Sequence, residues 1–272
     1  SVTANVTLLA NTCQAGTVAG TISDAVSGNA VSDVSLSVRS GLNVTSGNTT
    51  GTTAATANNG TYTLSSMNAG GYTVQASKDG YITSYFNVNV CGNLTSQNLS
   101  ISETLSSGTM RIVLHWGANS GLTIVDSHLT GPDNASGRFH IYWPNGKREF
   151  FYYTNDQTCS GCTASQKSDN VTLDKDDTNA PGTETITIPT DSWRSGTYRY
   201  SAHDYTNKAS TSTTKFSKSG TTVKVYYNGT ETTYNVPNSA GNLWTVFTID
   251  GSSKVVTSVN SMSFQTSSTS IQ

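Results

Sequence analysis

The sequence predicts a nearly all-β protein of two tandem antiparallel β-sandwich domains with strand-like N- and C-terminal extensions. Three observations predict this fold class. Helical periodicity is hard to find in the 272 residues. Short segments that alternate apolar and polar residues recur throughout, and Gly, Asn or Asp bounds them, as is typical of strands and turns. The chain is also long enough for two cores, because single cores usually stop growing near about 250 residues.

Composition favours a secreted protein and excludes two classes of partner. Only 12% of residues are charged, against about 25% in an average soluble protein. The net charge is -2 and no Lys/Arg run occurs, which excludes nucleic acid and anionic membranes as partners. No apolar run is long enough for a membrane span. The chain starts at Ser1 without an apolar signal region, so we expect a processed protein that is extracellular or on the cell surface.

The first half of the chain predicts a small β-sandwich over residues 16–105, preceded by an N-terminal extension over residues 1–15. Turns are expected at Asn58–Gly60 and Lys78–Gly80, because Asn-Gly and Asp-Gly pairs tolerate positive φ angles. Five segments are strand-like, namely Val18–Ile22, Val34–Val38, Tyr62–Leu64, Tyr72–Ala76 and Tyr85–Val90. This number of strands in about 90 residues is typical of a sandwich.

The order of these motifs resembles the carboxypeptidase regulatory-like domain, a transthyretin-like sandwich. The resemblance spans roughly residues 16–103. It is carried by Gly20–Asp24, Asn29–Val34, Asn59–Leu64, Gly70–Ala76 and Lys78–Ile82. It implies an accessory or spacer module, since no catalytic signature accompanies the pattern.

A short polar segment, Glu103–Thr109, marks the expected boundary with a second domain at residues 109–251. All four His residues lie beyond it, together with most of the charged residues. The polar chemistry of the protein is therefore expected in the second domain.

The second domain predicts eight or nine antiparallel strands. Met110–Trp116 places Met110, Ile112, Leu114 and Trp116 on one face, as expected of a half-buried strand. A hairpin is expected between Arg138–Trp143 and Arg148–Tyr153, around the turn Pro144–Lys147. Later strands are expected at Asn170–Leu173, Glu184–Ile188, Thr197–Ala202, Thr222–Tyr227 and Leu243–Ile249.

Residues 109–251 resemble the YfaP-like family, a set of extracytoplasmic domains without a well-defined activity. The matching stretches are Arg111–Gly117, Asp126–Pro132, Phe139–Tyr142, Leu173–Thr178, Glu184–Ile188, Gly196–Tyr200 with His203, and Asn242–Phe247. The CxxC loop and the aromatic hairpin depart from the family pattern.

The four cysteines predict two disulfides. Cys13 precedes the first strand of the first sandwich and Cys91 follows its last strand, so a bridge would tie the two ends together. Cys159 and Cys162 form a CxxC within a loop. A loop clip is favoured there over a redox pair or half of a metal site, because neither a βαβ setting nor a second ligand pair occurs.

Nine Asn-x-Ser/Thr sequons are candidates for glycosylation, although the abundance of Ser and Thr predicts many of them by chance. They are Asn5, Asn43, Asn48, Asn59, Asn93, Asn98, Asn134, Asn170 and Asn228.

Five residues of the second domain are candidate metal ligands: Asp126, His128, Asp174, Asp176 and His203. Residues two apart in a strand leave the same face about 7 Å apart, so Asp126 and His128 could share an ion, as could Asp174 and Asp176. Their place in the family-like segments supports grouping them with His203. Oxygen ligands favour calcium, which we expect ahead of zinc. The alternative is that the Asp residues bond turn amides and the His residues bond backbone carbonyls.

The aromatic residues of the expected hairpin are candidates for stacking on a ligand, chiefly Tyr142, Trp143 and Tyr152. An exposed aromatic strip suits sugar rings or another subunit. The alternative is that loops or the neighbouring domain cover this strip.

An enzyme is not predicted, and no catalytic residues are assigned. A pair of carboxylates or a Ser-His-Asp set could arise by chance in a chain so rich in Ser and Asp. No nucleophile elbow, zinc-protease signature or P-loop accompanies such residues.

The two ends of the chain point to self-association. Val2, Ala4, Val6 and Leu8 alternate with polar residues, and Val255–Phe264 within the Ser/Thr-rich segment 252–272 is again apolar enough to pair. Strand addition between copies, used head to tail, gives a filament. We therefore predict a non-enzymatic extracellular structural protein, the subunit of a surface filament or layer that forms a homopolymer. The alternative is a secreted adhesion module that binds calcium or a surface polysaccharide.

Overall fold

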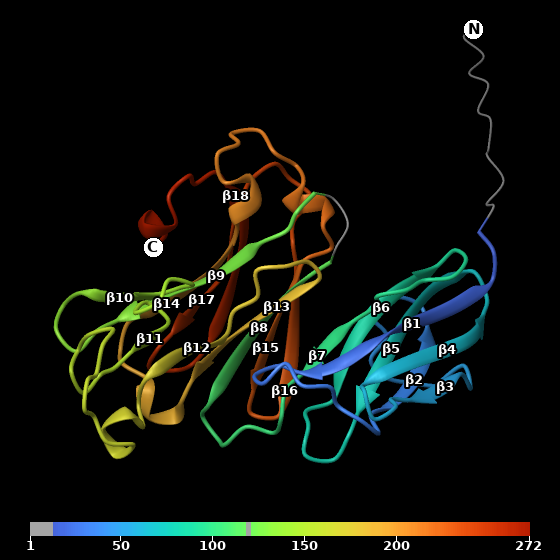
Figure 1. The fold of residues 1–272 in the computed structure, drawn as a ribbon, viewed down its shortest axis with the longest axis horizontal. Helices are drawn as coiled ribbons and strands as arrows, with labels where there is room; N and C mark the ends of the chain where they lie inside the picture. Colours follow the sequence, from blue (N-terminus) through green and yellow to red (C-terminus); the bar gives the residue numbers. More distant parts are fainter. Residues whose placement is uncertain (1–12, 118–120) are drawn as a thin grey trace, which may run out of the picture. The chain divides into compact units, whose positions relative to one another are not determined.

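The computed structural model describes residues 13–117 and 121–272 and confirms the predicted all-β class (Figure 1). The strands of the first half are β1 (Gly16–Asp24), β2 (Ser35–Ser40), β3 (Thr53–Ala55), β4 (Thr61–Met67), β5 (Gly70–Ser77), β6 (Ser84–Val90) and β7 (Leu99–Ile101). Those of the second half are β8 (Met110–Trp116), β9 (Val125–Pro132), β10 (Arg138–Ile141), β11 (Glu149–Phe150), β12 (Val171–Lys175), β13 (Gly182–Ile188), β14 (Thr197–Asp204), β15 (Thr222–Tyr227), β16 (Thr230–Asn235), β17 (Leu243–Asp250) and β18 (Val256–Ser263).

Helical structure in the described residues consists of single 3₁₀ turns, none of which could span a membrane. They are η1 (Ser165–Lys167), η2 (Thr190–Ser192), η3 (Tyr205–Asn207), η4 (Phe216–Lys218) and η5 (Ser268–Ser270).

The first compact unit contains residues 13–22, Ala30–Lys78 and Ser84–Leu99. Its two sheets have the strand orders β3-β2-β5-β6 and β4-β1-β7. Alternate residues of the strands are buried, as the sequence pattern requires. Val18, Leu36, Val38, Leu64 and Val74 are all at most 1% exposed.

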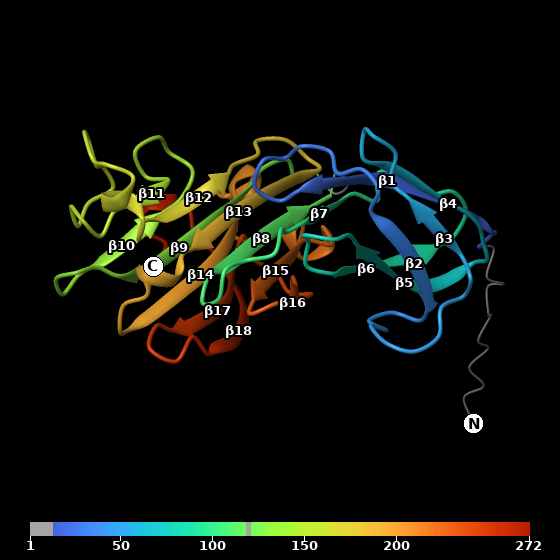
Figure 2. The same cartoon turned by 90° about the horizontal axis from the view of Figure 1, so that it is seen from below.

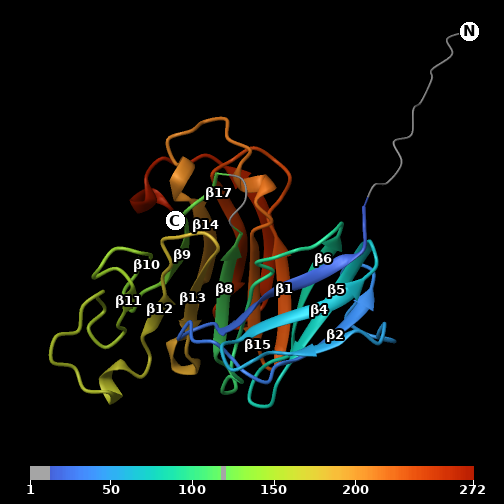
Figure 3. The ribbon, with the colours of Figure 1, turned by 45° about the vertical axis from the view of Figure 1, so that its right-hand side comes forward.

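The second compact unit contains Ser23–Asn29, Asp79–Thr83 and Ser100–Gln272. One sheet has five strands, β10-β9-β14-β17-β18, and the other has six, β11-β12-β13-β8-β15-β16. Figure 3 shows β8, β13 and β15 in front of β9, β14 and β17. The predicted inward face of β8 is confirmed, because Met110, Ile112, Leu114 and Trp116 are fully buried in the core of this unit.

The second unit includes Ser23–Asn29 and Asp79–Thr83, although both segments lie inside the range expected for the first sandwich. Their backbone explains this assignment. Ala25 N donates to Ile101 O, and Ile82 N donates to Ser102 O, each at 2.9 Å. The expected domain limits, 16–105 and 109–251, stay predictions.

The hairpin expected around Pro144–Lys147 is wrong. The turn exists, since Lys147 N donates to Pro144 O at 2.9 Å. However, β10 pairs with β9 in one sheet, and β11 pairs with β12 in the other. The turn therefore connects the two layers of the sandwich, because both flanking segments carry apolar residues that the core buries.

The second unit also has more strands than the eight or nine expected. β16 was not predicted because its residues are mostly polar and do not alternate with apolar ones. It pairs with β15 over its whole length. The C-terminal strand β18 pairs with β17 of the same chain. Residues 252–272 therefore contribute an edge strand to the five-stranded sheet.

Both predicted disulfides are present. Cys13 and Cys91 are joined with their Cα atoms 4.3 Å apart, and Cys159 and Cys162 form the loop clip. No free cysteine is left among the four.

Candidate functional site

Strands β9 and β14 bring three of the predicted metal ligands together. Asp126 lies directly opposite His203 in the register of the two strands, and His128 lies opposite Ser201. Residues two apart share a face of a strand, so Asp126 and His128 point away from the core that buries Leu129. One ligand atom from each of Asp126, His128 and His203 lies within 4.8 Å of the others.

This Asp-His-His cluster is buried, although it lies on the sheet face opposite the main core. Asp126 is 2% exposed, His128 is 1% exposed and His203 is fully buried. Two rings help to cover it. His140 Nε2 lies 2.9 Å from His128 Nδ1, and Tyr142 stacks on both His128 and His140.

The C-terminal segment covers the remaining side of the cluster. His203 Nε2 bonds the backbone oxygen of Gln265 at 2.8 Å. Arg199 donates to the backbone oxygen of Gln272 at 2.9 Å, and Ile271 is 2% exposed. Figures 1 and 2 show this red segment ending beside β9 and β10.

Burial dominates the electrostatics of the cluster. Burial and the nearby carboxyl group of Asp176 raise the pKa of Asp126 to about 8. Burial and the neighbouring imidazoles lower the pKa of His128 well below its ordinary value. Burial also lowers the pKa of His203. The electrostatics therefore favour neutral imidazoles, the form in which histidine binds metals.

Sequence patterns gave little indication that Glu184 would lie next to this cluster. Glu184 extends from β13 of the facing sheet, and it is fully buried. Its Oε2 accepts from Ser127 N at 2.6 Å. Burial and the carboxyl groups of Asp126 and Asp176 raise the pKa of Glu184 well above its ordinary value. The one feature of the sequence that pointed to Glu184 is that it is the only charged residue of β13.

The other two predicted ligands do not join the cluster. Asp174 accepts from Thr187 Oγ1 at 2.5 Å. Asp176 forms an ion pair with Arg148. Asp174 lies in β12 and Asp176 directly follows this strand. Both are bound to neighbouring side chains rather than to His203.

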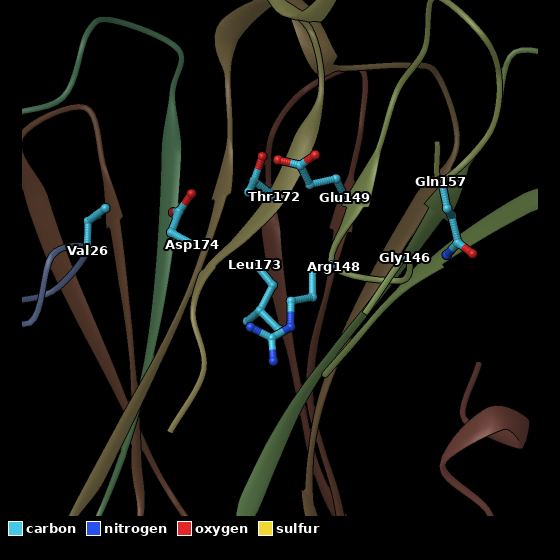
Figure 4. Close-up of a pocket in the computed structure, with 8 residues that line it drawn as sticks. All are labelled: Val26, Gly146, Arg148, Glu149, Gln157, Thr172, Leu173 and Asp174. Carbon is cyan, nitrogen blue, oxygen red and sulfur yellow. The ribbon is translucent and has the colours of Figure 1, made fainter. Parts of the chain in front are cut away.

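A separate pocket of about 410 Å³ lies beside β11 and β12 (Figure 4). Five of its eight lining residues are polar, among them Arg148, Glu149, Gln157 and Asp174, and the others include Val26 and Leu173. This pocket is distinct from the Asp-His-His cluster.

The aromatic strip expected for ligand stacking is not exposed as predicted. Tyr142 is 6% exposed and stacks on the two imidazoles, while Tyr152 is 2% exposed within the core. Trp143 is half-buried against Tyr205. Packing of β10 and β11 into different sheets turns these rings inward, so their faces are covered.

Most of the sequons are on the surface. Asn5 lies outside the described residues. Of the others, the exposed ones are Asn43, Asn48, Asn59, Asn93, Asn134 and Asn228, while Asn98 and Asn170 are half-buried. The Nδ2 atom of Asn134 donates to Tyr152 O at 2.7 Å, which makes this sequon a poorer acceptor than its exposure indicates. Glycosylation stays a prediction.

Comparison with known proteins identifies one domain by family. The model of the carboxypeptidase regulatory-like domain matches residues 17–102, as the sequence motifs predicted. The match ends at residue 102, so the resemblance of residues 109–251 to the YfaP-like family stays a prediction. No curated protein matches the chain.

Solved structures give distant similarities. The major pilin SpaD from Corynebacterium diphtheriae is 13% identical, with 82% of this chain and 64% of that chain covered, at a TM-score of 0.29. A putative carbohydrate-binding protein from Bacteroides uniformis is 13% identical, with 84% and 98% covered, at 0.26. BcpA, the major pilin subunit of Bacillus cereus, is 10% identical, with 90% and 92% covered, at 0.27. This chain therefore spans about two thirds of the length of SpaD. TM-scores this low do not indicate a function for this chain.

Proposed function

We propose that this chain is a non-enzymatic extracellular structural protein whose copies associate by strand addition into a surface filament or layer. The observation that carries the proposal is the edge strand β18, which contains Val259 and is flanked by Val255 and Phe264. Val255, Val259 and Phe264 are 56%, 42% and 40% exposed, and they are three of the five exposed large hydrophobic residues in the described part of the chain.

An edge strand with exposed apolar side chains is a template for another strand. β18 ends the strand order of its sheet, so only β17 pairs with it in the described residues. The register shifts between Thr245 and Phe247, and Asn260 has a positive φ of 48°. This bulge interrupts the edge, so we expect an incoming strand to pair along Val256–Val259.

The proposed occupant is the N-terminal segment of a second copy. Val2, Ala4, Val6 and Leu8 alternate with polar residues, which is the pattern of a strand with one apolar face. Nine extended residues span about 30 Å, enough to run along the eight residues of β18 at about 3.3 Å each. The segment itself lies outside the described residues.

Two further features support an extracellular, non-enzymatic role. Both disulfides, Cys13–Cys91 and Cys159–Cys162, are of the kind that persists in oxidising compartments. Asp126, His128 and His203 would be the natural acid-base groups of an enzyme, yet each is at most 2% exposed. A substrate could not reach them.

The test is electron microscopy and sedimentation of the purified full chain. Wild-type protein should form ordered fibres or layers. Deletion of residues 1–10 and the variant Val259→Lys should each leave soluble monomers. Thr232→Lys on exposed β16, the edge of the other sheet, is the matched control and should assemble normally.

Unchanged assembly of the deletion variant would exclude the N-terminal segment as the added strand. Monomeric wild-type protein at all concentrations would exclude the structural role.

A second candidate is a carbohydrate-binding adhesion module, favoured by the polar pocket of Figure 4. Arg148, Glu149, Gln157 and Asp174 offer donors and acceptors suited to sugar hydroxyls. It ranks second because the described residues that line the pocket include no aromatic ring for stacking. Glycan screening of wild type and Glu149→Ala tests it, and unaltered binding in the variant would exclude this pocket.

A further inference from the structure

The Asp-His-His cluster contains polar atoms that are buried without a partner. Asp126 Oδ2 and His128 Nε2 have no hydrogen-bond partner in the described residues, and both residues are at least 98% buried. An unsatisfied buried polar group costs about 1–3 kcal/mol. Two such atoms on neighbouring ligand-type side chains of one strand face indicate a missing bonding partner.

His203 is oriented as a metal-binding histidine. Its Nε2 lies 2.8 Å from the backbone oxygen of Gln265. A carbonyl oxygen only accepts, so the ring proton resides on Nε2 and the lone pair resides on Nδ1. Ser268 Oγ lies at the long distance of 3.5 Å from Nδ1. Metal-binding histidines characteristically donate their other N–H to a carbonyl or carboxylate in this way.

The Gln265 carbonyl is itself held in place. The backbone N–H of Gln265 donates to Asn242 Oδ1 at 2.7 Å, and Asn242 is fully buried. The tautomer of His203 is therefore set by a fixed backbone partner rather than by solvent.

His128 has the same arrangement with the nitrogens exchanged. Its Nδ1 lies 2.9 Å from His140 Nε2. When Nδ1 carries the proton and donates to His140, the lone pair of His128 resides on Nε2, the atom without a partner. Each imidazole of the cluster then has one nitrogen bound to the protein and one available to an ion.

We propose that Asp126, His128 and His203 form a binding site for a divalent transition-metal ion of the zinc class. Two imidazoles and one carboxylate are the ligands that such ions prefer, whereas calcium takes six to eight oxygens. This chemistry reverses the preference for calcium that the sequence indicated, because Asp174 and Asp176 are bound elsewhere. The three side chains leave a fourth position for water.

The spacing of the ligand atoms is compatible with an ion after a small closure. Bonds of about 2.0–2.1 Å in a tetrahedron place ligand atoms about 3.3 Å apart. The present separations reach at most 4.8 Å. The ion would thus draw the side chains together by up to about 1.5 Å and would link β9 to β14 beneath the C-terminal segment.

The test uses the purified full chain, stripped with a chelator and then titrated with Zn²⁺ or Co²⁺. We expect one saturable ion per chain by calorimetry and visible absorption bands from Co²⁺ bound to nitrogen and oxygen. Ca²⁺ at the same concentration should not compete. His128→Gln and Asp126→Asn should each weaken Zn²⁺ binding by on the order of 100-fold or more, since even partners of the ligands contribute 10- to 100-fold.

His115→Gln is the matched control, because His115 is a half-buried histidine of β8 in the other sheet. It should bind Zn²⁺ as wild type does. Asp126→Asn keeps the shape of the side chain, and circular dichroism checks that each variant folds.

Three outcomes would overturn the proposal. One is the absence of saturable Zn²⁺ or Co²⁺ binding to folded wild-type protein. Another is equal loss of binding in His115→Gln. The third is wild-type affinity in folded Asp126→Asn together with folded His128→Gln. The result does not depend on assembly, because all three ligands belong to one chain and the bound ions are counted per chain.

Discussion

Lys224 of β15 and Glu231 of β16 form a diagonal pair across the two strands, and their side chains are 7% and 5% exposed. The two charges lie 2.9 Å apart. Burial lowers the pKa of Lys224, while the carboxylate of Glu231 acts in the opposite direction. The pair therefore stabilises the charged form of a lysine that the sheet would otherwise disfavour.

Removal of one partner should be costly. Glu231→Gln keeps the size of the side chain but leaves the buried ammonium without a counter-charge. We expect the free energy of unfolding to fall by about 3 kcal/mol, measured by urea denaturation. Thr232→Ala, at the exposed neighbouring position, should change it by less than about 0.5 kcal/mol. Similar small effects in both variants would contradict a stabilising ion pair.

His115 should contribute to acid destabilisation. Burial, with the nearby charges of Lys224 and Lys175, lowers its pKa to about 4 from the ordinary 6.5. The unfolded chain therefore binds a proton between pH 6.5 and 4 that the folded chain does not. The contribution of His115 is present above pH 6.5 and is lost as the pH falls toward 4.

The His115→Asn variant measures this contribution directly. Between pH 7 and pH 4, we expect it to lose less stability than wild type by on the order of 2 kcal/mol, allowing for partial exposure. Urea denaturation at several pH values gives the difference. Parallel curves for the two proteins would show that His115 does not titrate as expected.

The Asp-His-His cluster shows what residue spacing can and cannot predict. The alternation of a strand was enough to place Asp126 and His128 on one face. The same argument applied equally to Asp174 and Asp176, yet Arg148 and Thr187 bind those carboxylates. Only the pairing of β9 with β14 distinguished the two sets, because it brought His203 opposite Asp126.

At the scale of elements, the two disulfides close loops of very different length. Cys13–Cys91 links residues 78 positions apart, and Cys159–Cys162 links residues three apart. A longer loop has more conformational freedom to lose in the unfolded chain. The first bridge should thus stabilise its unit more than the second.

Replacement of each pair by Ser should separate the two effects. Loss of Cys13–Cys91 should lower the free energy of unfolding by about 4 kcal/mol, and loss of Cys159–Cys162 by about 2 kcal/mol. Calorimetry or urea denaturation of the two double variants measures both. The reverse order would mean that the CxxC clip contributes more than its loop length accounts for.

Strands with a clear apolar alternation were predictable, whereas polar edge strands were not. β8 was expected with the bounds that the structure has, since four apolar residues alternate along it. β16 has the sequence Thr-Glu-Thr-Thr-Tyr-Asn and is mostly exposed. β16 is held by its backbone hydrogen bonds to β15 rather than by burial of apolar side chains. Such hydrogen bonds require no periodic pattern of apolar residues, so the sequence does not reveal them.

At the scale of the whole molecule, the described chain contains two sandwich units that differ in their share of polar chemistry. The first unit matches a known domain family and is closed by a long-range disulfide. The second contains all four histidines and the edge strand β18. The proposed assembly and the proposed metal site thus both belong to the second unit, and each has its own test.

The sequence by itself determined the all-β class, the two disulfides, the carboxypeptidase regulatory-like domain and the inward face of β8. Each of these follows from local alternation, cysteine placement or ordered motifs. Tertiary structure alone decided that β10 and β11 join different sheets, that β18 pairs within its own chain, and that His203 completes the pair Asp126 and His128. The physical reason is that strand partners are selected by burial and backbone hydrogen bonds between residues far apart in the sequence, which spacing along the chain does not encode.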